Sequence, residues 1–324
     1  MQPEGINIMG PERIKKLNTT KILDNMGAFI ALIILVVVMT FLSPAFLQTQ
    51  NILNIFVHIS TIAIMGIGMT FIILTGGIDL SVGSIAAFTA LIMAVLMKAG
   101  VPVWAALLLG AVAGALQGWL NGAIIALVNV PPFIVTLGMM SIARGGAFTI
   151  TSGQPVYTFP EAFPAIAGNF LGIPIPVLIM VGMYVVSWYV LRNTRFGRYV
   201  YALGGNETVC QLAGIRVKAV KQAVYIISGV CCAAAAVITT ARLDSAVPVA
   251  FTGEELDAIA AVIIGGTSLS GGQGTLLGTI IGALIMGVVG NGLNLLIVPQ
   301  GAQRIIKGAI IVIAVIIDIK RKRE

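Results

Sequence analysis

The sequence predicts an all-α protein that crosses a membrane about ten times, with some helices short or broken. Composition is the first reason: apolar residues make up 58% of the 324 residues and charged residues only 10%, against about 25% charged residues in a typical soluble protein. The second is that residues 25–78, 99–143 and 258–303 contain no Asp, Glu, Lys or Arg. Each stretch is long enough for two membrane-spanning helices of roughly 20 residues.

Prolines and glycines mark where the expected helices begin and end. Pro44, Gly76-Gly77 and Pro131-Pro132 separate the early ones, because proline interrupts a helix and glycine permits the backbone angles of a turn. The expected crossings are 27–42, 52–75, 80–97, 102–128, 133–151, a sixth after Pro174 as far as 191, 223–241, 256–269, 276–298 and 305–319. The third and the eighth are candidates for short re-entrant or broken helices, because glycines interrupt their ends.

Basic residues cluster beside the expected helices. Cytoplasmic segments next to membrane spans are rich in Lys and Arg, so we expect three cytoplasmic parts: an N-terminal segment 1–24, a loop at about 192–222 and a basic tail 320–324. The transmembrane domain then covers 25–319, and the Pro-rich segment 152–174 lies outside. Because the net charge of +7 is placed in this way, it indicates membrane topology rather than a nucleic-acid partner.

The fourth expected crossing carries a glycine at every fourth position. Gly110, Gly114, Gly118 and Gly122 leave one face of the helix without side chains. Small residues let helix backbones approach closely in a membrane, where the hydrophobic effect does not drive helices together. We expect tight packing within one subunit. The alternative is a helix that lines a moving gate, since Gln117 and Asn121 lie near that face.

The sequence argues against an enzyme. His58 is the only histidine and lies alone in an apolar run, and no His, Cys and carboxylate cluster has metal-ligand spacing. The sequence also lacks a GxxxxGK[ST] phosphate-binding loop. We therefore expect no metal or cofactor on this chain, and an intramembrane enzyme is a disfavoured alternative.

A stand-alone secondary transporter is the other alternative. Such proteins place ionisable residues deep in the membrane to couple ions to substrate. The candidates here are Asp79, Arg144, Arg242, Asp244, Glu254, Glu255 and Asp257. Most of them are expected near helix ends, and a succession of buried carboxylates is missing, so the energy source is expected on a partner.

Several long motifs resemble one family of transport proteins. The passages are GGIDLSVGS at 76–84, RFGRYVYALGGNE at 195–207, LAGIRV at 212–217, ELDAIAAVIIGGTSLSGG at 255–272 and NGLNLL at 291–296. They look like the permease subunits of ABC-type sugar importers, and the resemblance runs from about Leu23 to Lys320. Within this family the chain is most similar to the bacterial permeases for ribose; galactose, xylose and arabinose are the alternative substrates.

The resemblance implies an ABC importer permease fold and a set of partners. These are a second permease subunit, with a homodimer expected, a cytoplasmic ATPase that binds ATP and Mg, and an extracytoplasmic sugar-binding protein. It also implies the bacterial inner membrane, with both termini in the cytoplasm. The segments Ser152 to Pro174 and Ser245 to Gly253 are candidates for docking the binding protein.

The resemblance also assigns a contact with the ATPase to the basic loop. The residues concerned are Gly204, Gly205, Asn206, Glu207, Leu212, Ala213, Gly214 and Ile215. A short helix from about Glu207 to Ala213 is expected, with Glu207 in its first turn, where a negative charge suits the helix dipole. The alternative is an ordinary cytoplasmic loop with surface charge.

Sugars are bound through hydrogen bonds, so polar residues in apolar spans are candidates to line the translocation pathway. These are Asp79, Ser81, Gln117, Asn121, Asn291 and Asn294. Asn291 and Asn294 are three residues apart and share a helical face. Helix capping is the alternative role for Asp79 and Ser81.

Overall fold

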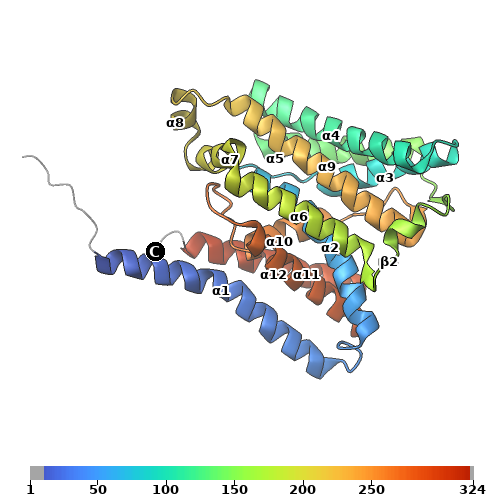
Figure 1. Ribbon diagram of the computed structural model, residues 1–324, viewed down its shortest axis with the longest axis horizontal. Coiled ribbons are helices and arrows are strands. Elements are labelled where there is room, and N and C mark those ends of the chain that lie inside the picture. Colours follow the sequence, from blue (N-terminus) through green and yellow to red (C-terminus); the bar gives the residue numbers. More distant parts are fainter. Residues whose placement is uncertain (1–10, 322–324) are drawn as a thin grey trace, which may run out of the picture.

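A computed structural model describes the backbone of residues 11–321 and the side chains of residues 27–320. Parts of the predicted N-terminal segment and basic tail, residues 1–10 and 322–324, lie outside the described residues. The described chain is helical, with only two-residue strands (Figure 1). Its α-helices are α1 Pro11–Leu42, α2 Thr49–Leu74, α3 Val82–Lys98, α4 Val103–Val128, α5 Pro132–Ile150, α6 Ile175–Asn193, α7 Arg195–Gly205, α8 Glu207–Leu212, α9 Val217–Leu243, α10 Glu254–Ile264, α11 Leu276–Leu295 and α12 Gln300–Arg321.

The all-helical membrane fold predicted from composition is confirmed. Each of the ten expected crossings corresponds to one helix, α1 to α6 or α9 to α12, and the basic loop adds α7 and α8. Among the described residues, six helices are long and apolar enough to cross a membrane: α2, α4, α5, α6, α9 and α11. Residues 27–42 and 82–98 form shorter apolar stretches of helix.

Two crossings combine a helix with a non-helical segment. α10 has 11 residues, which gives a length of about 16 Å, roughly half of a bilayer's hydrocarbon core. α3 has 17 residues and follows the non-helical segment 75–81. The first turns of these two helices meet inside the bundle, because Gly83 of α3 lies against Phe251 and Glu255.

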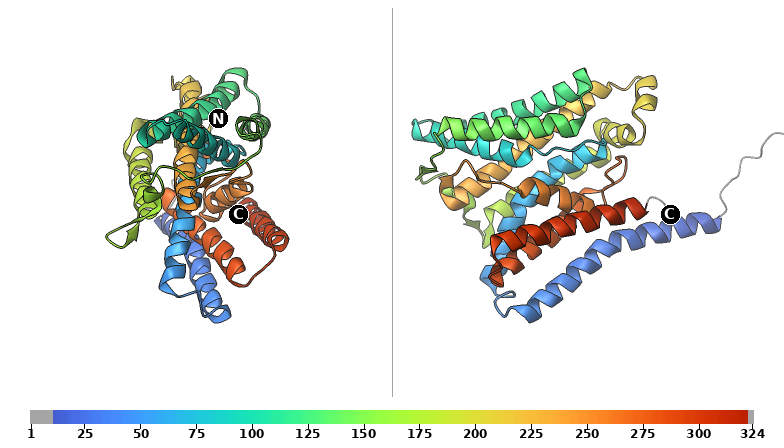
Figure 2. Two further views of the ribbon diagram at one scale, coloured as in Figure 1. Left: turned by 90° about the vertical axis from the view of Figure 1, so that its right-hand side faces the viewer. Right: turned by 180° about the vertical axis from the view of Figure 1, so that it is seen from behind.

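α2 is the centre of the bundle. Of its apolar 18-residue window, 89% is buried, and it packs against α6, α9, α10 and α11. The corresponding windows of α4, α5 and α6 are 28%, 22% and 22% buried. α4 and α5 lie at one edge of the bundle and α1 and α12 at another (Figure 2). The outer helices therefore present broad apolar faces to whatever surrounds the subunit.

The glycine face of α4 lies against α9. A Cβ on Gly114 would overlap with the carbonyl oxygen of Gly229, and one on Gly118 with that of Tyr225. Gly122 faces Gln222 in the same way, whereas Gly110 packs on Met93 of α3. All four glycines thus adjoin neighbouring helices of the same subunit, and at Gly114, Gly118 and Gly122 the close neighbours are backbone atoms that leave no room for a larger residue.

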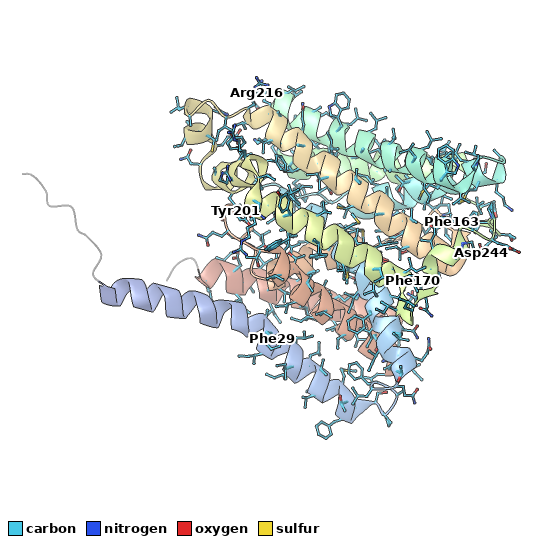
Figure 3. The ribbon with its side chains drawn as sticks, in the orientation of Figure 1. Phe29, Phe163, Phe170, Tyr201, Arg216 and Asp244 are labelled. Carbon is cyan, nitrogen blue, oxygen red and sulfur yellow. The ribbon has the colours of Figure 1, made fainter. Side chains whose placement is uncertain are left out.

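The two ends of the bundle differ. α7, α8 and the two ends of the described chain lie together, and the segment containing β2 lies at the opposite end (Figure 1). Tyr201 and Arg216 mark the first end, and Phe163, Phe170 and Asp244 the second (Figure 3). An even number of crossings brings the termini to the same end.

At the second end of the bundle, one pair of short strands joins the segment 152–174 to the segment 245–253. β1 Val156–Tyr157 pairs antiparallel with β4 Ser245–Ala246, and β2 Asn169–Phe170 pairs with β3 Ile173–Pro174. The backbone amide of Phe159 also donates a 3.2 Å hydrogen bond to the Asp244 carboxylate. The segments 152–174 and 245–253 thus form one surface.

Candidate functional site

The segment between α6 and α9 is folded into two capped helices. The side chain of Thr194 accepts a 3.1 Å hydrogen bond from the amide of Gly197 at the start of α7. Asn206 does the same for α8, accepting a 3.0 Å bond from the amide of Val209. Polar side chains at these positions satisfy amides that have no partner within the helix. The short helix expected at 207–213 therefore corresponds to α8, with Glu207 in its first turn.

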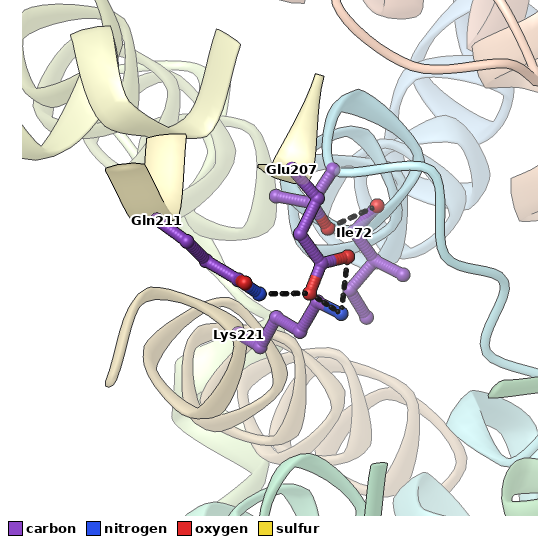
Figure 4. Close-up of polar contacts among 5 residues, drawn as sticks. Ile72, Glu207, Gln211 and Lys221 are labelled. Carbon is purple, nitrogen blue, oxygen red and sulfur yellow. Dashed lines mark hydrogen bonds and ion pairs between the residues drawn. The ribbon is translucent and has the colours of Figure 1, made fainter. Parts of the chain in front are cut away.

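Glu207 connects α8 to α9. Lys221 of α9 donates to both carboxylate oxygens of Glu207 at 2.8 Å, and Gln211 donates at 3.4 Å (Figure 4). The Lys221 side chain is 18% exposed and that of Glu207 is 42% exposed. Ion pairs this exposed contribute about 0–1 kcal/mol to stability, so the pair serves to orient α8 more than to stabilise it.

α8 carries an exposed apolar surface. Leu212 is 84% exposed and Val209 is 58% exposed, and the adjoining Ala213 and Gly214 are also exposed. Gly214 has φ of +77°, a left-handed conformation that glycine adopts without strain. Apolar side chains held on a rigid, capped helix outside the bundle are suited to insertion into a groove on another protein.

The end of α7 is packed into a junction with two other motifs. Gly204 has no room for a side chain, because the carbonyl oxygen of Leu74 and the amide of Gly272 lie against it. That amide donates a 2.9 Å hydrogen bond to the Leu74 oxygen. The junction therefore joins α7 to the end of α2 and to the loop between α10 and α11.

Tyr201 makes a second connection to the same loop. Its hydroxyl donates a 3.0 Å hydrogen bond to the carbonyl oxygen of Gly274. Burial raises the pKa of Tyr201 above its usual value, so the phenol stays neutral and remains a donor. Gly204 and Tyr201 thus fix the position of α7 relative to the loop 265–275.

Asp79 and Ser81 lie in a closed polar cluster. The amide and hydroxyl of Ser81 donate to one oxygen of Asp79 at 2.9 Å and 2.5 Å. Ser228 of α9 donates to the other oxygen at 3.4 Å, and Asn121 of α4 donates to Ser81 at 2.9 Å. Asp79, Ser81 and Asn121 are fully buried, so in this conformation they line no open passage.

The capping role considered for Asp79 and Ser81 takes a different form. Ser81 occupies the N-cap position of α3 but makes no side-chain cap bond there. Asp79 instead accepts from the amide two residues ahead, which is the local turn that Asp favours. The Oδ1 atom of Asn121 is buried and has no partner.

The other three residues proposed for the pathway lie elsewhere. Gln117 donates a 3.4 Å bond to Ala113 of its own helix. Asn291 exchanges hydrogen bonds of 2.8 Å and 3.1 Å with Asn51 at the start of α2. Asn294 accepts a 2.9 Å bond from Gln303 of α12. The six residues therefore do not form one site: three form the Asp79 cluster, and the two asparagines of α11 connect helix ends.

A charged cavity lies near the first turn of α10, and none of the six residues expected on the translocation pathway lines it. It has a volume of about 520 Å³ and is lined by α10's first turn, by α12 and by His58 of α2. Lys307 donates a 2.5 Å bond to Asp257 across it. The sequence contains a signal for it, because Glu254, Glu255 and Asp257 stand close together in an apolar protein and Lys307 interrupts an apolar run.

Comparison with known proteins identifies the family. The family model described as "Branched-chain amino acid transport system / permease component" matches residues 51–315. The chain belongs to this permease family. It is therefore a transport subunit rather than an enzyme.

The relatives match along nearly their whole length. The chain is 47% identical to the ribose import permease protein RbsC of Escherichia coli (strain K12), over 91% of this chain and 94% of that protein. It is 44% identical to the ribose import permease protein RbsC of Bacillus subtilis (strain 168), over 95% and 96%. It is 42% identical to the D-allose transport system permease protein AlsC of Escherichia coli (strain K12), over 94% of each chain. No solved structure matches the chain.

Proposed function

We propose that this chain is the membrane subunit of an ATP-driven importer for a monosaccharide, with ribose as the substrate. The observation that carries the proposal is the 47% identity to a ribose import permease over 91% of the chain. Relatives named for D-allose and L-arabinose are 42% and 34% identical, so these sugars are the competing substrates.

The proposal includes three partners and an orientation. A cytoplasmic ATPase subunit binds ATP and Mg and contacts α8, a second copy of this chain completes the pore, and an extracytoplasmic protein delivers the sugar. The subunit lies in the bacterial inner membrane with both termini, α7 and α8 in the cytoplasm. The clustered basic residues between 192 and 221 support this orientation.

In the proposed mechanism, motion passes from the ATPase to the bundle through α8 and α7. The exposed apolar residues Val209 and Leu212 suit a groove on the ATPase. A shift of α8 on nucleotide binding moves α7, and Gly204 passes that shift to the end of α2 and to the loop before α11. α10, which is about half as long as a full crossing, is attached to that loop. Displacement of α10 therefore opens or closes the middle of the bundle. The polar groups of the Asp79 cluster become accessible in another conformation.

Reconstitution tests the proposal. The chain is placed in proteoliposomes with the ATPase and the sugar-binding protein of a ribose importer from the same organism, and uptake of radiolabelled ribose is measured. We expect uptake only when ATP and both partner proteins are present, with D-allose and L-arabinose competing weakly. Uphill uptake without the ATPase, driven by a proton or sodium gradient, would contradict the proposal.

A further inference from the structure

The cavity at the first turn of α10 has the dimensions of a small-molecule site. Its volume of about 520 Å³ falls within the roughly 300–1,000 Å³ typical of ligand pockets. It is bounded by the start of α10, the first half of α12 and His58 of α2. These elements lie far apart in the sequence, and the cavity exists only because the helices are packed together.

The start of α10 forms one wall of the cavity, which opens to the surface of the subunit at the exposed Gln300 and Arg304. The segment before α10 runs inward from the strand β4, and Arg144 of α5 holds it with hydrogen bonds of 2.7 Å to the carbonyl oxygens of Pro248 and Ala250. The first turn of α10 then packs on Gly83, at the beginning of the other broken crossing. Charged side chains within an apolar membrane protein are costly where they face lipid and typically mark a substrate pathway.

The lining contains both donors and acceptors of hydrogen bonds. Three carboxylates, from Glu254, Glu255 and Asp257, face two cations, from Arg304 and Lys307. Most of these groups have partners: Asp257 is paired with Lys307, and Glu255 accepts from the amide of Gly253 at 3.2 Å. Glu254 differs, because its Oε2 atom is buried and has no hydrogen-bond partner. A buried carboxylate oxygen without a donor is costly, and a ligand hydroxyl would supply one.

The mixture of charges selects a neutral polyol. An anion would face three carboxylates, and a free cation would face Arg304 and Lys307. No group of side chains suited to hold a metal ion exists among the described residues. A sugar hydroxyl both donates and accepts, so it satisfies a carboxylate and a cation at once without adding charge.

From this geometry we infer that the α10–α12 cavity is a sugar-binding station on the translocation pathway, in which Glu254 accepts hydrogen bonds from sugar hydroxyls. The inference rests on the proposed function, since it takes a sugar to be the transported solute. It places the pathway beside α10, whose far end abuts α11 at the Gly265–Gly278 contact. α10, which binds the sugar, is then also the helix that moves when the junction of Gly204 with Leu74 and Gly272 is displaced.

Filling the cavity is the sharpest test. Gly308 lines the cavity and has open space where a side chain would be, so Gly308→Leu adds an apolar group inside it. Gly301 lies on the same helix, also faces open space and is not among the lining residues, so Gly301→Leu is the matched control. Both changes replace glycine in a helix with a better helix former. Each variant is reconstituted with the ATPase and the binding protein.

We expect Gly308→Leu to lower ribose uptake at least tenfold while ATP hydrolysis stimulated by the binding protein stays within twofold of the unmodified complex. Gly301→Leu should leave both rates unchanged. Glu254→Gln replaces the carboxyl group with an amide of the same shape, and should lower uptake by about tenfold.

The outcomes separate this inference from the proposed function. If the unmodified complex imports ribose and both cavity variants do so at its rate, the station does not exist, although the proposed function stands. If the unmodified complex shows no ATP-dependent uptake of ribose, the proposed function fails first. If Gly308→Leu instead splits a dimer of the chain, as measured by native mass spectrometry, the cavity is a contact between copies and the inference is wrong.

Discussion

The amide of Gly272 donates a 2.9 Å hydrogen bond to the carbonyl oxygen of Leu74, and Gly204 lies directly against both atoms. Three separate sequence motifs meet at this point: the end of α2, the end of α7 and the loop between α10 and α11. A Cβ atom added to Gly271 would also lie 2.8 Å from the Cα atom of Gly204. The three atoms nearest to a side chain at Gly204 are all backbone atoms, so we expect a movement of α7 to displace the other two motifs.

Gly204→Ala should disrupt this junction. The added methyl group overlaps with backbone atoms of Leu74 and Gly272, which cannot rotate away as a side chain can. Overpacking of this kind costs about 1–3 kcal/mol. We expect a lower thermal unfolding temperature and fewer sugar molecules imported per ATP hydrolysed. Gly205→Ala is the control for the unfolding temperature, since a methyl group there meets no atom within 4 Å; equal unfolding temperatures of the two variants would mean that the junction is not tightly packed.

Leu212→Arg should weaken binding of the ATPase subunit. The side chain is 84% exposed on α8, so the change disturbs no packing within the subunit. Loss of an apolar contact at the centre of an interface typically costs about 1–3 kcal/mol, or roughly 10- to 100-fold in Kd. Surface plasmon resonance against the purified ATPase in detergent measures it. Ile297→Arg, 88% exposed between α11 and α12, should keep the unmodified affinity.

Glu207→Lys should uncouple transport without unfolding the protein. It places a second cation beside Lys221, so α8 loses the contact that orients it. Folding stability should change by less than about 1 kcal/mol, because the pair is partly exposed. The sugar imported per ATP should fall. The double variant Glu207→Lys with Lys221→Glu restores an ion pair in reverse and should recover coupling; failure of the exchange to rescue would mean that Glu207 contacts the ATPase directly.

Gly214 is a poorer position for such a test. Its φ of +77° would strain any larger residue, so loss of transport in Gly214→Trp would not separate a backbone effect from a lost contact. Leu212, which neighbours it on the surface, avoids this ambiguity.

The sequence predicted those parts of the structure that depend on local pattern. Long uncharged stretches located the crossings, and the short helix expected from about Glu207 to Ala213 corresponds to α8. Pairings across the fold could not be read in this way. Lys307 and Asp257 are 50 residues apart, and Asn51 and Asn291 are 240 apart. Asn291 is polar in an apolar helix, and this pattern predicts a position facing a passage. That Asn291 hydrogen-bonds to Asn51 is known only from the packing of the helices.

The same distinction applies to the glycines of α4. Their spacing predicted a face for close packing, but not that α9 lies against three of them.

Gly118→Ala should lower the free energy of unfolding by about 1–3 kcal/mol, since the new methyl group overlaps with the Tyr225 carbonyl and pushes two helices apart. Gly138→Ala on α5 meets no atom within 4 Å and should be neutral or stabilising by up to about 1 kcal/mol. Unfolding in mixed micelles with increasing dodecyl sulfate measures both. Equal stabilities would mean that α4 and α9 separate freely, as a helix at a moving gate would, and the close-packed role of the glycine face would then be wrong.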